Sequence, residues 1–373
     1  MKALPLLAIT VVQTAFCLAH WFMYATWIDF WWPLRPTTQS ALAIAFALLS
    51  VIFIAATLLG FRFSNPFVKS FYWVAAIWIG FANFLLIAAI LARLIDLVLL
   101  VLPTTERLAA RPWIALVLLI AAIATGIYGF ANARAIRERR ISIRLPNLPP
   151  SWRGRTALLI SDLHLGHING TRFARRIAAM ARRLDPAIIF IAGDLYDGTK
   201  IDPSIASFPL FELSPPFGIY FVDGNHEGFG GATSYEAALV RAGIRVLNNE
   251  RVSVDGLQIV GVPYGPSTHP LALRAYLESL SLKTGPASIL LNHTPTQLPV
   301  AEHAGVSLQL SGHTHGGGQF FPFGLITRRA FGRFTYGLQR FGDMQVYTSS
   351  GAGTWGPPMR VGTHPEIVLL TFD

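Results

Sequence analysis

The sequence contains a single cysteine and few charged residues. Cys17 is the only thiol in 373 residues, which excludes a disulfide within the chain and a zinc site built from several cysteines. Asp, Glu, Lys and Arg make up 13% of the chain, against about 25% in soluble domains, while hydrophobic residues make up 53%. This composition excludes an ordinary soluble protein for at least part of the chain.

The shortage of charge is concentrated in the first third of the sequence. Four stretches there contain no Asp, Glu, Lys or Arg over the length that a helix needs to cross about 30 Å of hydrocarbon. A cleaved signal peptide is the alternative for the first stretch, but it is longer than a typical signal core and three more stretches follow it. We therefore expect an all-α four-helix transmembrane region at residues 1–133, with spans at residues 4–28, 40–61, 71–92 and 113–133.

Arginines near the ends of these spans predict how the chain is oriented. With the N-terminus inside, the densest group follows the fourth span and falls on the inner side, at Arg134, Arg137, Arg139, Arg140 and Arg144. We therefore expect a multi-pass protein whose C-terminal domain is cytoplasmic. Because this group directly follows a span, we expect the positive charge, +10 for the whole chain, to face anionic headgroups of a lipid bilayer. No nucleic acid partner is expected. Arg93 and Asp96, at the end of the third span, are expected to pair with each other at headgroup level.

The composition changes after residue 133. Residues 134–154 combine arginines with Pro146, Pro149 and Pro150, which end any helix, and they predict a juxtamembrane linker. From residue 155 to 373, short apolar runs alternate with stretches of helical spacing such as TRFARRIAAMARRL, which is typical of an α/β domain. The runs that predict buried strands are TALLIS, PAIIFIAGD, FGIYFVDGNHE, LQIVGVP, ASILLNH and VSLQLSGH.

Polar side chains directly follow five of these predicted strands. They are Asp162 and His164, then Asp194 and Asp197, then Asn225, His226 and Glu227, then His293, and finally His313 and His315. Taken singly, an Asp after a strand often caps a helix and a His often forms a hydrogen bond in a core. Active sites of α/β proteins, however, collect beyond the carboxyl ends of strands. Carboxylate, amide and imidazole donors at five strand ends therefore indicate a site for Mn, Fe or Zn.

The motifs D-x-H, G-D-x-x-D, G-N-H-[DE], a lone His and G-H-x-H occur here in that order and resemble the signature of calcineurin-like metallophosphoesterases. The last stretch, YTSSGAGTWGPPMRVGTHPEIVLLTF, resembles the close of a bacterial membrane-associated branch of that family. The sequence departs from the branch at Gly318, a third glycine before Gln319, and at Glu227, where Asp is common. The resemblance covers residues 155–373 and implies a four-layer αββα metallophosphoesterase sandwich held at a bacterial inner membrane.

The resemblance also implies two divalent metal ions and a role for each motif. One ion would bind Asp162, His164 and His315, the other Asn225, His293 and His313, and Asp194 would bridge both. His226 would be no ligand, but would face the substrate phosphate and protonate the leaving oxygen. Asp197 and Glu227 would orient a ligand or His226, with local capping as the alternative. Arg360 would contact the substrate phosphate through its planar guanidinium, with a surface salt bridge as the alternative.

These roles predict a membrane-anchored phosphoesterase that hydrolyses a phosphodiester or pyrophosphate bond. Because the chain is anchored near the bilayer, the expected substrate is a lipid such as a UDP-diacylglucosamine-type precursor. A soluble nucleotide is the alternative substrate, and a non-catalytic membrane scaffold with the same fold is the alternative function. The complete donor set and His226 argue against the scaffold, and the sequence indicates no oligomeric state.

Overall fold

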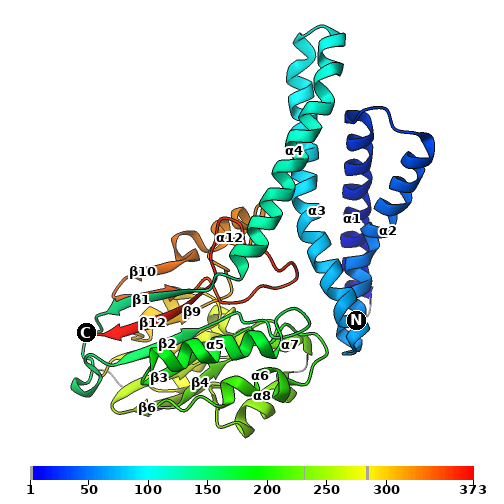
Figure 1. The fold of residues 1–373 in the computed structure, drawn as a ribbon. Helices are drawn as coiled ribbons and strands as arrows, with labels where there is room; N and C mark the ends of the chain where they lie inside the picture. Colours follow the sequence, from blue (N-terminus) through cyan, green and yellow to red (C-terminus); the bar gives the residue numbers. More distant parts are fainter. Residues whose placement is uncertain (1–2, 231, 283–284) are drawn as a thin grey trace. The chain divides into compact units, whose positions relative to one another are not determined.

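Long apolar helices form the first part of the computed structural model, which describes residues 3–230, 232–282 and 285–373 (Figure 1). They are α1 (Ala3–Phe30), α2 (Pro36–Arg62), α3 (Pro66–Val98) and α4 (Thr104–Ala133), with a short helix η1 (Leu99–Val101) after α3. Among the described residues, four helices are long and apolar enough to cross a membrane, which confirms the all-α N-terminal region. The chain divides into two units, one of Met1–Ala131 with Gly356–Pro358 and one of Asn132–Trp355 with Met359–Asp373.

The helices extend beyond the predicted spans because residues that favour the start of a helix lie outside those spans. Pro36 and Pro66 occupy first-turn positions, where a missing backbone N–H leaves no bond unmade. The side chain of Asn65 accepts a hydrogen bond from the backbone N–H of Val68 at 2.9 Å and so caps α3. Helix α4 likewise begins at Thr104, well before the predicted residue 113, and continues through Pro112.

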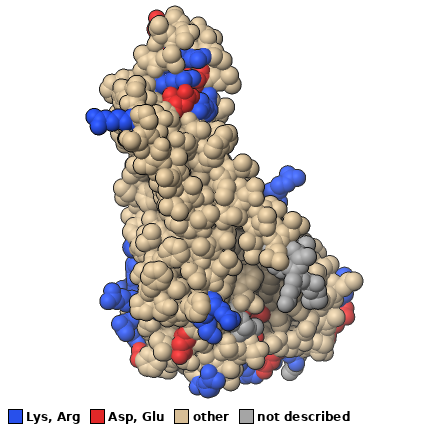
Figure 2. Space-filling model, turned by 90° about the vertical axis from the view of Figure 1, so that its right-hand side faces the viewer, with Lys and Arg blue, Asp and Glu red and all other residues tan. Residues whose placement is uncertain are grey.

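Charged side chains gather between helices near one end of this unit. Arg93 binds Asp29 of α1 at 2.6 Å, and Asp96 binds Arg111 of α4 at 2.8 Å. The expected pairing of Arg93 with Asp96 is therefore wrong, because acidic and basic residues on neighbouring helices offer closer partners. Figure 2 shows this cluster of blue and red side chains near the top of the view, with a mostly uncharged stretch of surface directly below it.

Two packed sheets form the core of the second unit. The first has the order β1-β12-β2-β3-β4-β5, and the second has the order β10-β11-β9-β8-β7-β6. The first sheet consists of β1 (Arg137–Ile143), β2 (Thr156–Ile160), β3 (Ile188–Ala192), β4 (Ile219–Val222), β5 (Arg245–Val246) and β12 (Glu366–Phe372). The second consists of β6 (Glu250–Val254), β7 (Leu257–Gly261), β8 (Ser288–Leu291), β9 (Leu308–Ser311), β10 (Gly337–Phe341) and β11 (Met344–Thr348).

Helices cover the outer faces of both sheets, and the remaining helices are short. The first sheet is covered by α5 (Thr171–Leu184), α6 (Pro203–Phe211) and α8 (Ala232–Arg241). The second is covered by α10 (Pro270–Ser279) and α11 (Leu298–His303). The others are α7 (Glu227–Gly230), α9 (Tyr264–Ser267), α12 (Phe323–Phe331), η2 (Pro150–Trp152) and η3 (Gly332–Thr335).

Alternation along the strands creates these layers. In β3, Phe190 and Ala192 point into the core between the sheets, while Ile189 and Ile191 point toward the helices. The second sheet divides its side chains in the same way, with Ile289 facing the first sheet and Leu290 facing the outer helices. The αββα sandwich implied by the resemblance is therefore confirmed.

The segment predicted as a linker, residues 134–154, contains a strand. Strand β1 pairs in parallel with β12 from Arg137 with Glu366 to Ile143 with Phe372. The linker prediction is wrong for these residues, because β1 carries exposed charged side chains and is stabilised by a partner from the far end of the chain. After it, the buried Trp152 donates a hydrogen bond to the carbonyl of Val254 at 2.9 Å.

Substitutions in β1 test whether this strand is part of the fold. Ile143 is fully buried between the sheets, so Ile143→Ala is expected to lower the free energy of unfolding by about 2–5 kcal/mol. Arg140→Ala, on the exposed part of the same strand, is expected to change it by less than about 0.5 kcal/mol. Thermal denaturation of the two variants measures the difference, and equal melting temperatures would contradict a structural role for β1.

Candidate metal centre

The predicted ligands lie where parallel strands of both sheets end. Asp162 follows β2, Asp194 follows β3, Asn225 follows β4, His293 follows β8 and His313 follows β9, each by no more than three residues. Because the strands run in parallel within each sheet, these positions fall at the same edge. Residues distant in the sequence are thereby brought together.

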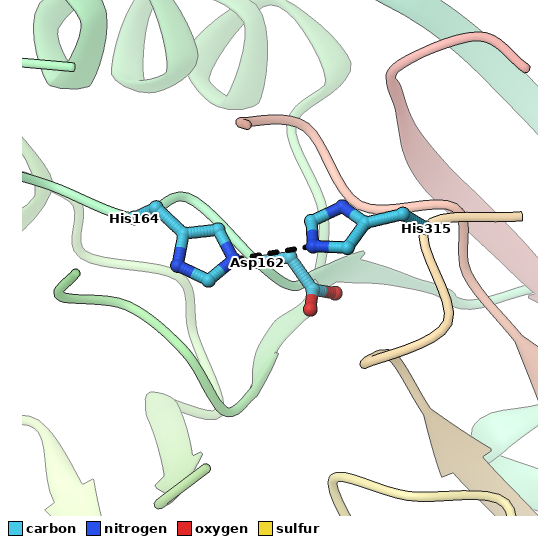
Figure 3. A group of neighbouring side chains, drawn as sticks. All are labelled: Asp162, His164 and His315. Carbon is cyan, nitrogen blue, oxygen red and sulfur yellow. Dashed lines mark hydrogen bonds between the residues drawn. The ribbon is translucent and has the colours of Figure 1, made fainter. Parts of the chain in front are cut away.

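The first group of donors consists of Asp162, His164 and His315. One donor atom from each residue lies within 4.8 Å of the other two. The Nε2 atoms of His164 and His315 face each other at 3.3 Å, with the carboxylate of Asp162 beside them (Figure 3). Two facing ring nitrogens cannot both carry a proton, so at least one presents a lone pair.

The second group consists of Asp194, His293 and His313, whose donor atoms also lie within 4.8 Å of one another. Nε2 of His293 is 3.1 Å from Oδ2 of Asp194 and has no hydrogen-bond partner of good geometry among the described residues. Nδ1 of His313 lies 3.0 Å from Oδ1 of Asn225, which adds an amide oxygen to this group. Carboxylate and amide oxygens and imidazole nitrogens therefore lie close together in this group.

Asp194 belongs to the second group and also faces the first. Its Oδ1 accepts a hydrogen bond from the backbone N–H of His226 at 2.9 Å. Its Oδ2 lies 3.1 Å from Nε2 of His293 and 3.9 Å from Nε2 of His164, which belong to different groups. One oxygen is therefore held by the backbone while the other faces donors of both groups.

Burial keeps most of the histidine rings neutral. It is the main cause of the lowered pKa values of His164, His226 and His315, and it lowers the pKa of His313 to about 4. A neutral imidazole is the form that binds a metal ion. These rings therefore have the protonation state that a metal site requires.

The buried carboxylates create a demand for positive charge. Burial raises the pKa of Asp162 to about 6. Burial also opposes the charge of Asp194, but the nearby rings of His293, His164 and His226 together outweigh it and lower the pKa of Asp194. For His293 itself, burial is outweighed by Asp194 and Asp162, which raise its pKa to about 10. The donor set fits divalent cations, because cations would take over the compensation that a protonated His293 otherwise provides.

The backbone at the site is held in an unusual conformation. The angle φ lies between 46° and 69° at five predicted ligands, namely Asp162, His164, Asp194, His313 and His315. This left-handed conformation costs an ordinary residue roughly 1 kcal/mol or more, so the surrounding fold must stabilise it. Such strain collects at functional sites.

Glu227 holds the backbone that carries Asp194. Its buried carboxylate accepts hydrogen bonds from the N–H groups of Asp194 and Tyr196, both at 3.0 Å, and from that of Gly224 at 2.6 Å. It thereby connects the loops that follow β3 and β4. The predicted alternatives for Glu227 were orientation of a ligand or local capping, and its contacts favour orientation of Asp194 through the main chain.

The ring of His226 is positioned by a backbone carbonyl. Its Nδ1 lies 3.1 Å from the carbonyl oxygen of Asp197, so Nδ1 carries the hydrogen and Nε2 is directed elsewhere. The carboxylate of Asp197 instead accepts hydrogen bonds from the backbone N–H and hydroxyl of Thr199, at 2.7 and 2.5 Å. The side chain of Asp197 therefore serves as a local cap, and only its main chain orients His226.

Arg360 does not have the exposure that a substrate contact requires. Its side chain is wholly buried. The guanidinium donates to the carbonyls of His315, Gly351 and Gly353 at 3.1, 3.3 and 2.6 Å, and it lies 3.0 Å from Nδ1 of His315. The predicted substrate contact is therefore not supported, because the guanidinium is directed at His315 and the loop around Gly351.

Three aromatic residues near the site were not predicted. The rings of Phe229 and Trp355 lie with their centroids 5.1 and 5.2 Å from that of His226, and 60% and 42% of these residues are exposed. The ring of Tyr264 lies 6.0 Å from that of His293. Tyr264 follows β7 closely, so the rule of strand ends could have identified it. The other two follow no predicted strand directly and gave no such signal.

The fold and the donors together define a metal-dependent hydrolase domain, with carboxylates and imidazoles at the joined ends of two sheets. A model of the calcineurin-like phosphoesterase family matches residues 155–317. An uncharacterized metallophosphoesterase of Aquifex aeolicus is 30% identical over 256 residues, which are 67% of this chain and 97% of that protein. The chain belongs to the calcineurin-like metallophosphoesterase family, as its motifs predicted.

Other relatives are longer than this chain. A transmembrane protein with metallophosphoesterase domain from Bos taurus is 30% identical over 289 residues, 72% of this chain and 64% of the relative. An uncharacterized metallophosphoesterase of Campylobacter jejuni is 29% identical over 245 residues, 63% of this chain and 62% of the relative. The chain thus spans less than two thirds of these two relatives.

Glycine substitutions test the close packing of the centre. A Cβ on Gly224 would lie 2.2 Å from Oδ1 of Asp194, whereas a Cβ on Gly228 would meet nothing within 4 Å. Gly224→Ala is therefore expected to displace Asp194 and weaken metal binding about tenfold or more, while Gly228→Ala leaves it unchanged. Metal content after dialysis, measured by elemental analysis, checks this. Equal metal content in two folded variants would show that Asp194 is not a ligand.

Proposed function

We propose that this chain is a membrane-anchored phosphoesterase that uses two divalent metal ions to hydrolyse a phosphodiester or pyrophosphate bond. The observation that carries the proposal is the position of Asp194, whose Oδ2 faces donors of two separate groups. Residues 1–133 would provide the anchor and residues 155–373 the catalytic domain. Manganese, iron and zinc all suit the mixture of donors.

Seven side chains would hold the ions. One ion would bind Asp162, His164 and His315, the other would bind Asn225, His293 and His313, and Asp194 would contact both. When bound, such ions supply Lewis acidity at the phosphoryl oxygens and lower the pKa of the attacking water. The chain itself fixes the positions of the donors, through Glu227 behind Asp194 and Arg360 behind His315.

His226 would provide the proton for the leaving oxygen. Its Nδ1 is held by the carbonyl of Asp197, which leaves Nε2 as the atom that can exchange a proton. Burial lowers the pKa of the ring, so the free site holds it neutral, and an anionic substrate would favour its protonation. The ring then acts as a general acid.

The proposed substrate is a lipid, for example a UDP-diacylglucosamine-type precursor, because a membrane anchor would keep the catalytic domain near the bilayer. The exposed rings of Phe229 and Trp355 beside His226 would meet an apolar part of the substrate. A soluble nucleotide is the second candidate, since the same two rings could stack on a base. The choice between the two depends on relative turnover of lipid and nucleotide diesters.

Hydrolysis of an aryl phosphodiester with and without added Mn²⁺ tests the activity. His226→Ala is expected to lower kcat by about 10²–10⁴ while the protein retains its metal. Asp194→Asn is expected to lose both activity and metal, because the amide removes the charge between the two groups. Absence of turnover by the wild type with every divalent metal would favour a non-catalytic scaffold.

The orientation of the chain is a separate proposal, which rests on the arginines that follow α4. We expect the catalytic domain to be in the cytoplasm of a bacterial cell, with the helices in the inner membrane. A reporter fused after Asp373 should therefore be active only if it functions in the cytoplasm. A reporter signal from the periplasm would reverse the orientation and leave the chemistry of the site unaffected.

A further inference from the structure

A basic and apolar surface lies next to the metal centre. Residues 320–341 contain no Asp or Glu and carry four arginines, Arg328, Arg329, Arg333 and Arg340. Helix α12 lies within this stretch and has no buried residue. In Figure 1 it stands apart from α5, α6 and α8, which cover the first sheet.

The exposed face of α12 combines large apolar side chains with positive charge. Phe323, Leu325 and Ile326 are 51%, 61% and 66% exposed. Phe323 and Ile326 are three residues apart and so share one side of the helix. Arg328 and Arg329 are exposed in the last turn, and neither takes part in an ion pair between described residues. An apolar and cationic helix of this kind is typical of the interface of a bilayer.

This segment is joined to the loop that carries His313 and His315. The ring of Phe331, at the end of α12, contacts that of His313 edge-on, with 5.8 Å between centroids. The hydroxyl of Thr314 donates to the carbonyl of Thr335 at 2.7 Å. A Cβ on Gly324 would lie 2.4 Å from the carbonyl oxygen of Gly317, so the start of α12 also packs closely on this loop. Helix α12 and the segment after it are therefore packed directly against the loop that carries His313.

We propose that α12 lies in the headgroup region of an anionic lipid bilayer and presents phospholipid-type substrates to the metal centre. Three observations favour a bilayer as the binding partner of α12. Residues 320–341 contain no Asp or Glu, α12 exposes large apolar side chains, and the same chain has four apolar helices. Only residues 134–136 separate α4 from β1, so the domain is tethered close to the end of a membrane helix. The proposal rests on the proposed function, because it names the source from which that site would take its substrate.

Site-specific fluorescence tests the contact with lipid. In a Cys17→Ser background, Ile326→Cys and Leu271→Cys would each carry an environment-sensitive fluorophore, in full-length protein reconstituted into vesicles with phosphatidylglycerol. Leu271, on α10, is the matched control, with 79% exposure against 66% for Ile326. Lipids that carry a quencher in the acyl chain are expected to quench at residue 326 and not at residue 271. Equal, weak quenching at both residues would overturn the proposal.

Paired substrates separate this proposal from the proposed function. Leu325→Asp together with Ile326→Asp is expected to lower kcat/KM about tenfold for a diacylglycerol-linked phosphodiester in vesicles. Turnover of a soluble aryl phosphodiester is expected to stay unchanged, because neither residue contacts the donors, and this also shows that the variant is folded. An equal loss on both substrates, or no loss on the lipid, would contradict a role for α12 in lipid presentation. Failure of the wild type on the soluble ester would instead contradict the proposed function.

Discussion

The donor site of the second unit depends on the charge balance of two buried carboxylates. Asp162 and Asp194 have almost no contact with solvent, and burial alone would favour their neutral forms. Asp194 has one oxygen held by the backbone N–H of His226, and both oxygens of Asp162 accept from the backbone N–H of His313. Both carboxylates also lie beside imidazole rings. Such an arrangement is stable only if positive charge is supplied at the same point. The carboxyl ends of both sheets therefore have to meet around a cation or a protonated histidine.

Two further buried polar side chains keep the loops of the site in place. Glu227 ties together main-chain N–H groups that follow β3 and β4, and Arg360 ties carbonyls of the C-terminal loop to His315. Each makes several hydrogen bonds to main chain, and the charge of Arg360 strengthens the bonds that it donates. This explains how strained backbone at the predicted ligands persists. It also gives the C-terminal stretch a part in the site, although it supplies none of the seven proposed ligands.

The strands that carry the motifs could be predicted because each is a short apolar run followed by polar residues. The family and the proximity of the proposed ligands followed from the order of these motifs. Strand β1 could not be predicted, because its exposed charged residues depend on pairing with β12 far along the chain. The burial of Arg360 and the pairing of Arg93 with Asp29 likewise depend on contacts between distant segments. No local pattern distinguishes such arginines from exposed ones.

The N-terminal apolar helices determine how strongly α12 itself has to bind a bilayer. A free protein that binds a bilayer loses translational and rotational freedom, which costs several kcal/mol. A helix of nine residues with three large exposed apolar side chains would scarcely offset that cost. With the four apolar helices in the bilayer, as proposed, this freedom would already be lost, and the local concentration of lipid would be high. A short, weakly binding helix would then suffice to hold the loop of His313 against the bilayer surface.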